Sequence, residues 1–141
     1  MPDNFLGENF YGYQVRNPFP GEMDYFKNNA HVAGMAAEDG KITLNPYSML
    51  NVEQRASVAK NEAIRLWMKD NDFEPKFNVT PAQLNLFKGS DYSKPENVLH
   101  LKHTLISRYL TGDPSAGELT PLQKHWAEIL RSKLPQDNQQ K

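Results

Sequence analysis

The chain contains no cysteine among its 141 residues. This absence excludes disulfides, thiolate metal sites and cysteine nucleophiles, and it is typical of a protein made in a reducing cytosol. Lysine and arginine form no run that could follow a phosphate backbone, and the net charge is −1, so nucleic acid is not an expected partner. No apolar stretch approaches the ~20 residues that a membrane span requires, and the first residues lack the pattern of a signal peptide.

Two local patterns that mark enzymes are also missing. No serine lies in a G-x-S-x-G context, and the glycines form no phosphate-binding loop. We therefore expect no nucleotide and no other cofactor.

The first 21 residues carry five aromatic side chains but show neither helical nor strand periodicity. We expect an irregular arm over residues 1–21, a single globular domain over 22–134 and a disordered tail over 135–141. The aromatic side chains could pack on their own domain or dock on a neighbouring subunit, because aromatic residues are enriched at interfaces. The residues of this candidate interaction arm are Phe10, Tyr11, Tyr13 and Phe19. We expect the stretch from Phe10 to Phe19 to cross to another chain in the working assembly.

A β-hairpin followed by a long helix is predicted for residues 32–69. Alternation at Ile42 and Leu44 favours a strand, and Glu38-Asp39-Gly40 favours a turn before it. The helix begins after Asn51, which can form a capping box with Gln54. Its predicted core face consists of Val52, Ala56, Ala59, Ala63, Leu66 and Trp67. The three alanines would let another element approach closely.

The C-terminal half repeats one helix-start signal. Thr80-Pro81-Ala82-Gln83 and Thr120-Pro121-Leu122-Gln123 each place Thr at the N-cap, Pro at N1 and Gln at N3. We expect helices over 80–87, 95–110 and 120–134, and a short helix over 22–29. The predicted fold class is therefore α+β and mostly helical, with one two-stranded β-hairpin packed against a long helix and three or four further helices.

Three polar residues on the long helix form a candidate cluster: Asn61, Glu62 and Arg65. Glu62 and Arg65 are three residues apart on one helical face, which suits an ion pair. The hairpin-then-helix layout also resembles the zincin class of metallopeptidases, in which a helix carries H-E-x-x-H. Asn61 and Arg65 stand where the two histidines would bind zinc, so the resemblance implies a scaffold without its metal ligands. We expect a structural polar cluster, with a ligand-binding pocket as the alternative.

The four histidines form no recognisable metal site. His100 and His103 are three residues apart on a predicted helix, but no Asp or Glu shares their face, and His31 and His125 are isolated. We expect ordinary surface or edge histidines and no bound metal.

Residues 31–65, and more loosely 80–130, resemble a group of small uncharacterised proteins encoded by tailed bacteriophages and prophages. The matching residues are Val32-Ala33-Gly34-Met35-Ala36, Glu38-Asp39, Leu44-Asn45-Pro46-Tyr47-Ser48, Asn61-Glu62-Ala63, Arg65 and Gly112-Asp113-Pro114-Ser115. The resemblance implies a virion component or a host-directed binding protein, located in the particle or in the host cytoplasm.

Two classes of function follow from these patterns. The first is a non-catalytic structural or interaction protein of a phage particle, which contacts other virion proteins or copies of itself through its arm and its hairpin edge. The second is a zincin-like hydrolase that cleaves peptides or cell wall with an unusual site around Glu62. The missing zinc ligands favour the first class.

Overall fold

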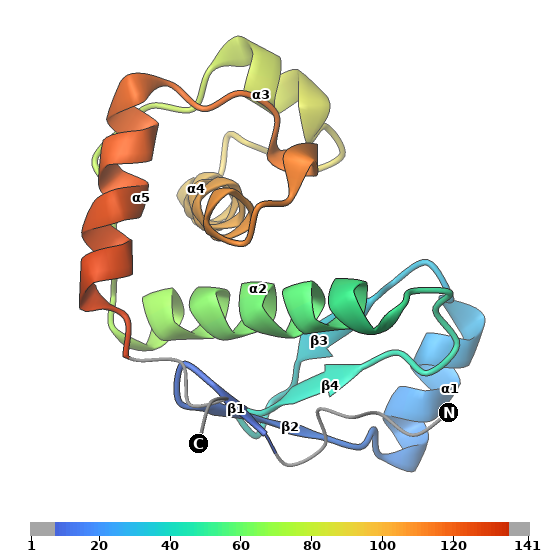
Figure 1. Cartoon of the computed structure of the whole chain (residues 1–141). Helices are drawn as coiled ribbons and strands as arrows, with labels where there is room; N and C mark the ends of the chain where they lie inside the picture. Colours follow the sequence, from blue (N-terminus) through green and yellow to red (C-terminus); the bar gives the residue numbers. More distant parts are fainter. Residues whose placement is uncertain (1–7, 136–141) are drawn as a thin grey trace. The chain divides into compact units, whose positions relative to one another are not determined.

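A computed structural model of the chain describes residues 8–135 (Figure 1). The chain divides into two compact units, residues 1–67 with 135–141 and residues 68–134. This division differs from the arm, body and tail that we expected, since its boundary lies between Trp67 and Met68 near the end of the long helix. Except for Pro135, the predicted tail lies outside the described residues, as does the arm residue Phe5.

The first unit contains a small mixed sheet and two helices. Its elements are β1 (Asn9–Phe10), β2 (Tyr13–Arg16), α1 (Pro20–Asn28), β3 (Gly34–Ala36), β4 (Ile42–Leu44) and α2 (Val52–Asp70), the last of which continues past the unit boundary. The strand order is β1-β2-β4-β3. The outer pairs β1–β2 and β3–β4 are antiparallel, whereas β2 runs parallel to β4 with Val15 opposite Ile42. Helix α2 lies across one face of this sheet (Figure 1).

The prediction of two strands was wrong, because β1 and β2 lie in the segment where we expected no regular element. Tyr11 and Gly12 connect them in a two-residue turn and both have positive φ, 54° and 92°. This is the backbone geometry that matches the twist of a hairpin, but Tyr is an unusual residue for it. The predicted hairpin itself is present as β3 and β4, and every predicted helix is present within about two residues of its expected ends.

The core of the first unit forms where α2 meets the sheet. Ala59, Ala63 and Leu66 of α2 are buried against a set of sheet side chains that comprises Phe10, Val15, Ile42 and Leu44. The small side chains of α2 let the sheet approach closely, as the sequence predicted. Val52, which we placed on this face, is 45% exposed instead.

Three of the four residues predicted for the interaction arm pack inside their own unit. Phe10 is fully buried in the core of its own unit, and Tyr11 and Tyr13 pack against the same core. These three residues of the arm therefore pack on their own unit, the first of the two alternatives. Phe10 cannot cross to another chain while it fills this core, whereas Phe19 is 54% exposed.

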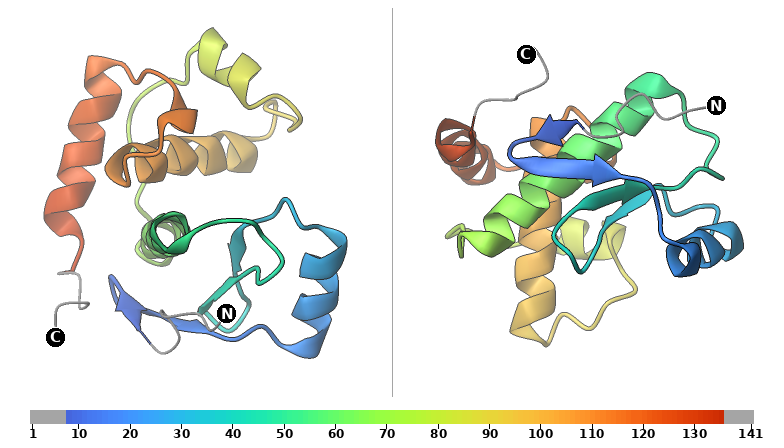
Figure 2. Two further views of the ribbon diagram at one scale, coloured as in Figure 1. Left: turned by 45° about the vertical axis from the view of Figure 1, so that its right-hand side comes forward. Right: turned by 90° about the horizontal axis from the view of Figure 1, so that it is seen from below.

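The second unit is helical. It contains α3 (Pro81–Leu86), α4 (Pro95–Leu110), a 3-10 turn η1 (Pro114–Ala116) and α5 (Pro121–Lys133). Both predicted capping boxes are present, with Thr80 and Thr120 as the N-caps and Gln83 and Gln123 at N3. Helix α5 and η1 both lie beside α4 (Figure 2). The buried apolar side chains of these elements are Leu101, Leu105, Ile106, Ala116, Ala127 and Leu130.

These elements confirm the predicted fold class, α+β and mostly helical. The described residues contain five α-helices and one small four-stranded sheet. None of these helices combines the length and the apolar character that crossing a membrane requires.

Gly34 is the tightest point between β3 and α2, and it generates a stability prediction. A Cβ atom at this position would lie 2.9 Å from Leu44 Cδ2, 3.0 Å from Val58 Cγ1 and 3.1 Å from the Thr43 carbonyl oxygen. We expect Gly34→Ala to lower the free energy of unfolding by about 1–3 kcal/mol, because backbone and core side chains must move to admit the methyl group. Urea unfolding monitored by circular dichroism measures the change.

The matched control is Gly21→Ala in the first turn of α1, where a Cβ atom would meet open space. This substitution is expected to be neutral or slightly stabilising. Equal stability of Gly34→Ala and the wild type would show that β3 does not lie against α2 as described.

Candidate functional site

The predicted cluster on α2 is an ion pair with a polar neighbour. Arg65 Nη1 lies 3.3 Å from Glu62 Oε2, and both side chains are mostly buried, with exposed fractions of 23% and 13%. The predicted pairing of Glu62 with Arg65 is thus confirmed. The Oδ1 atom of Asn61 is buried and has no hydrogen-bond partner among the residues that the structure describes. The pair places the Arg65 cation beside the Glu62 carboxylate.

The histidines are distributed over both units. His31, His100 and His125 are exposed, as expected for surface histidines. His103 is a correction, because it is buried and its Nε2 atom lies 2.8 Å from the Phe73 carbonyl oxygen. Within residues 8–135, no three His, Asp or Glu side chains are grouped so that they could hold a metal ion.

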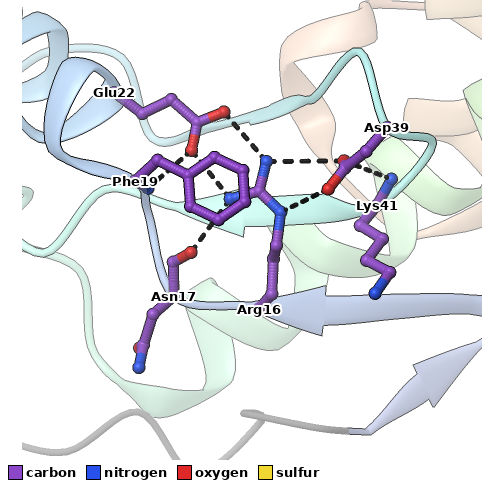
Figure 3. A network of polar contacts seen from close by, with 6 residues as sticks. All are labelled: Arg16, Asn17, Phe19, Glu22, Asp39 and Lys41. Carbon is purple, nitrogen blue, oxygen red and sulfur yellow. Dashed lines mark hydrogen bonds and ion pairs between the residues drawn. The ribbon is translucent and has the colours of Figure 1, made fainter.

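A polar network that sequence reasoning missed surrounds Arg16 at the end of β2 (Figure 3). Its guanidinium donates two hydrogen bonds to the carboxylate of Glu22, at 2.7 and 2.9 Å, and a further one of 2.8 Å to Asp39. The guanidinium also lies over the ring of Phe19, 3.8 Å from its centroid. Glu22 accepts a hydrogen bond from the Phe19 backbone N–H, so one carboxylate caps α1 and holds Arg16. The network ties the β3–β4 turn to the junction of β2 and α1.

The charges in this network shift one another's pKa values. The hydrogen bonds from Arg16 hold the pKa of Glu22 and that of Asp39 below their ordinary values, and the two carboxylates raise the pKa of Arg16. All three groups are therefore charged at neutral pH. Since each charge is compensated inside the molecule, the network's role is structural.

Asn45 organises the segment that follows β4. Its Nδ2 atom faces three carbonyl oxygens, those of Val32 at 2.6 Å, Asn29 at 3.3 Å and Phe26 at 3.4 Å. Its Oδ1 atom accepts a 2.8 Å hydrogen bond from the backbone N–H of Tyr47. The side chain is completely buried, so these contacts replace all of its hydration.

The backbone of Asn45 fixes the other end of the same segment. Its carbonyl oxygen accepts hydrogen bonds from Ser48 Oγ at 3.0 Å and from Arg55 Nη1 at 2.8 Å. Asn51 then closes a capping box with Gln54 at the start of α2, as predicted. The connection from Asn45 to α2 is therefore held by hydrogen bonds on both sides of Met49 and Leu50, at Tyr47 and Ser48 before them and at Asn51 after them.

This ordered connection presents apolar side chains to solvent. Met49 is 98% exposed, Tyr47 is 42% exposed and Val52 is 45% exposed. We call these three residues the Met49 surface. These three exposed apolar side chains lie within six residues of the sequence, and methionine adapts well to partner surfaces. The sequence contained a signal for it, since residues 47–52 are unusually apolar for a connection.

Two polar features in the second unit complete the description. The side-chain amides of Gln83 and Gln123 donate to each other, at 2.7 and 2.9 Å, so the two predicted capping boxes are joined in the core. A groove of about 530 Å³ lies beside the N-terminal half of α4, where Glu74 and Glu96 are balanced by Lys76 and Lys102. The groove contains none of the predicted site residues.

The Arg16 network predicts a pH-dependent stability. The lowered pKa values mean that its stabilisation is complete above the carboxylates' ordinary values of 4.5 and 3.8, and is lost as pH falls through their lower folded values. Arg16→Met should therefore be less stable than the wild type at pH 7. The difference should shrink progressively as the pH falls below 4.5. Thermal unfolding across this range measures it.

The matched control for this prediction is Arg131→Met. Arg131 makes a 2.9 Å ion pair with Glu128, but both side chains are more than half exposed. Its loss should change stability by less than about 0.5 kcal/mol. A gap between the wild type and Arg16→Met that stays constant down to pH 2 would contradict the assigned network.

The contacts of Asn45 predict that the exchange of a single heavy atom in its side chain costs much stability. Asn45→Asp replaces the donor that faces three carbonyl oxygens with a buried carboxylate, so we expect a loss of at least about 3 kcal/mol of unfolding free energy. Asn51→Asp is the control, because Asp serves equally well as an N-cap. Urea unfolding at pH 7 compares the two variants, and similar stabilities would refute the central role of Asn45.

Comparison with protein-family models, curated protein sequences and solved structures found no match to this chain. The structural part of the interpretation therefore depends on the geometry of this chain. Two features of the structure matter for the function. Its polar side chains form hydrogen bonds within the molecule, and the connection before α2 exposes the Met49 surface.

Proposed function

We propose that the protein is a non-catalytic structural or interaction protein and a component of a bacteriophage particle. The observation that supports this proposal is the Met49 surface, which the molecule holds in place instead of burying. The phage assignment comes from the resemblance of residues 31–65. The proposed location is the virion, with the host cytoplasm as the place of synthesis.

Order in the connection is what makes the Met49 surface suitable for binding. Covering one large apolar side chain contributes about 1.5–3 kcal/mol. A flexible loop would lose part of that gain through ordering on association, whereas this connection is already held by Asn45, Ser48 and Arg55. Met49 would serve as the anchor, with Tyr47 and Val52 beside it.

The chemistry of the surroundings favours a protein partner. Residues 45–54 contain no lysine or arginine, and the guanidinium of Arg55 is hydrogen-bonded to the Asn45 carbonyl oxygen. Both a nucleic acid and an anionic membrane would need cationic side chains at the contact. Another virion protein, or a copy of this chain, fits an uncharged apolar surface better.

Quantitative mass spectrometry of purified phage particles tests the proposal. We expect the wild-type protein at a fixed copy number per particle and a strongly reduced copy number for Met49→Ser, because the anchor's apolar contact is lost. The substitution should leave stability within about 0.5 kcal/mol, since an exposed side chain contributes little to folding.

The control is Leu122→Ser, which removes a half-exposed leucine from the second unit. It should be incorporated like the wild type. Absence of the wild-type protein from particles would refute the virion assignment, and normal incorporation of Met49→Ser would refute the role of the Met49 surface.

A further inference from the structure

Within residues 8–135, strand β3 pairs with β4 on one side and with no strand on the other. The pairs Ala33–Asn45 and Ala37–Lys41 are joined by backbone hydrogen bonds of 2.9 and 2.8 Å, and they flank the register in which Met35 lies opposite Thr43. Hydrogen-bonded pairs alternate along an antiparallel ladder, so Met35 directs its N–H and C=O toward β4. Gly34 and Ala36 consequently direct theirs away from β4. Among the described residues, no hydrogen bond uses these four outward groups.

Apart from its length of three residues, the edge of β3 lacks the features that usually protect an edge strand. Residues 32–37 contain no charged residue and no proline, and Ala36 is exposed. Natural proteins commonly block such edges with lysine, proline or a bulge. The opposite edge is less suited to pairing, because β1 has two residues and ends at the positive-φ turn of Tyr11 and Gly12.

The outward groups are spaced so that the edge is complementary to itself. In an antiparallel pairing of two copies about a two-fold axis at Met35, Gly34 of each copy lies opposite Ala36 of the other. Each Gly34–Ala36 pair then exchanges two hydrogen bonds, which satisfies all four outward groups of each strand. Such an arrangement is an isologous interface that closes as a dimer.

We propose that β3 pairs with β3 of a second copy of this chain, so that the two sheets become one continuous sheet. This inference deepens the proposed function and rests on it, since it names one partner of an interaction protein. Uncharged side chains along residues 32–37 mean that the two copies meet without like-charge repulsion. A strand of another protein would satisfy the same backbone groups, but it would not require the two-fold spacing.

Substitutions of Met35 can test this register of pairing. Gly34 faces Val58 of α2, so Met35 lies on the opposite face of the sheet. At the two-fold axis it would lie directly opposite its own copy in a non-hydrogen-bonded pair, where side chains are closest. In a homodimer of Met35→Lys or of Met35→Glu, the introduced charge therefore lies opposite the same charge. In a dimer of one variant with the other, the two introduced charges have opposite signs.

Sedimentation velocity of the full chain, at concentrations up to about 1 mM, tests the pairing. We expect the wild type to dimerise and Met35→Lys and Met35→Glu each to raise the dissociation constant about fivefold or more. An equimolar mixture of the two variants should associate more tightly than either variant alone. Leu122→Lys is the control, because Leu122 is a half-exposed residue of α5 that belongs to neither proposed surface, and its change should leave the dimer unchanged.

A second variant tests the hydrogen bonds themselves. Ala36→Pro deletes an outward N–H without removing a bond to β4, so the fold should persist by circular dichroism while dimerisation weakens at least about tenfold. In the wild type, amide exchange at Gly34 and Ala36 should slow as concentration rises.

A monomeric wild type, a dimer that resists Ala36→Pro, or a charge mixture no tighter than its components would overturn the inference. Binding of a different protein's strand to a monomeric chain would overturn it as well. Loss of Met49→Ser from particles while the β3 dimer persists would separate the two proposals, since each surface is altered alone.

Discussion

The side chain of Asn45 is the contact on which the first unit depends. One buried amide group faces carbonyl oxygens from the end of α1 and the loop after it, and its own oxygen accepts from the connection to α2. Sheet, helix and connection are thus held by a residue that follows directly after β4. A buried amide is costly to leave unsatisfied, so these segments form together or not at all. Tyr47 of the Met49 surface is held by the same side chain, through its backbone N–H.

Local chemistry explains what could be predicted from the sequence. Thr80 and Thr120 cap their helices because side chain and backbone partners are three residues apart, and Glu62 pairs with Arg65 for the same reason. Such interactions are visible in sequence spacing alone. Strands β1 and β2 were missed because the turn at Tyr11 uses a backbone geometry that Asn or Gly normally supplies, and because β2 finds its partner β4 only through distant pairing.

The polar networks were harder to predict because they depend on contacts between distant segments. Arg16 meets Asp39 across 23 residues, and Gln83 meets Gln123 across 40 residues, although both glutamines were correctly identified as caps. Phe10 illustrates the opposite error, in which an aromatic residue without periodicity was assigned to a partner and is buried in its own core. Composition alone does not show whether an aromatic side chain is needed inside, since that depends on the volume that the small residues of α2 leave open.

Polar and apolar side chains are distributed in an unexpected way in this molecule. Polar side chains that could perform chemistry, such as Arg16, Glu22 and Asn45, bind one another or the backbone, while Met49 is left in solvent. A folding requirement explains the first arrangement, because buried polar groups need partners. It does not explain the second, since a polar residue at position 49 would serve an exposed connection better. Exposure of an apolar side chain on this segment, together with a strand edge that carries no protecting charge, is the basis on which we propose contact with other proteins.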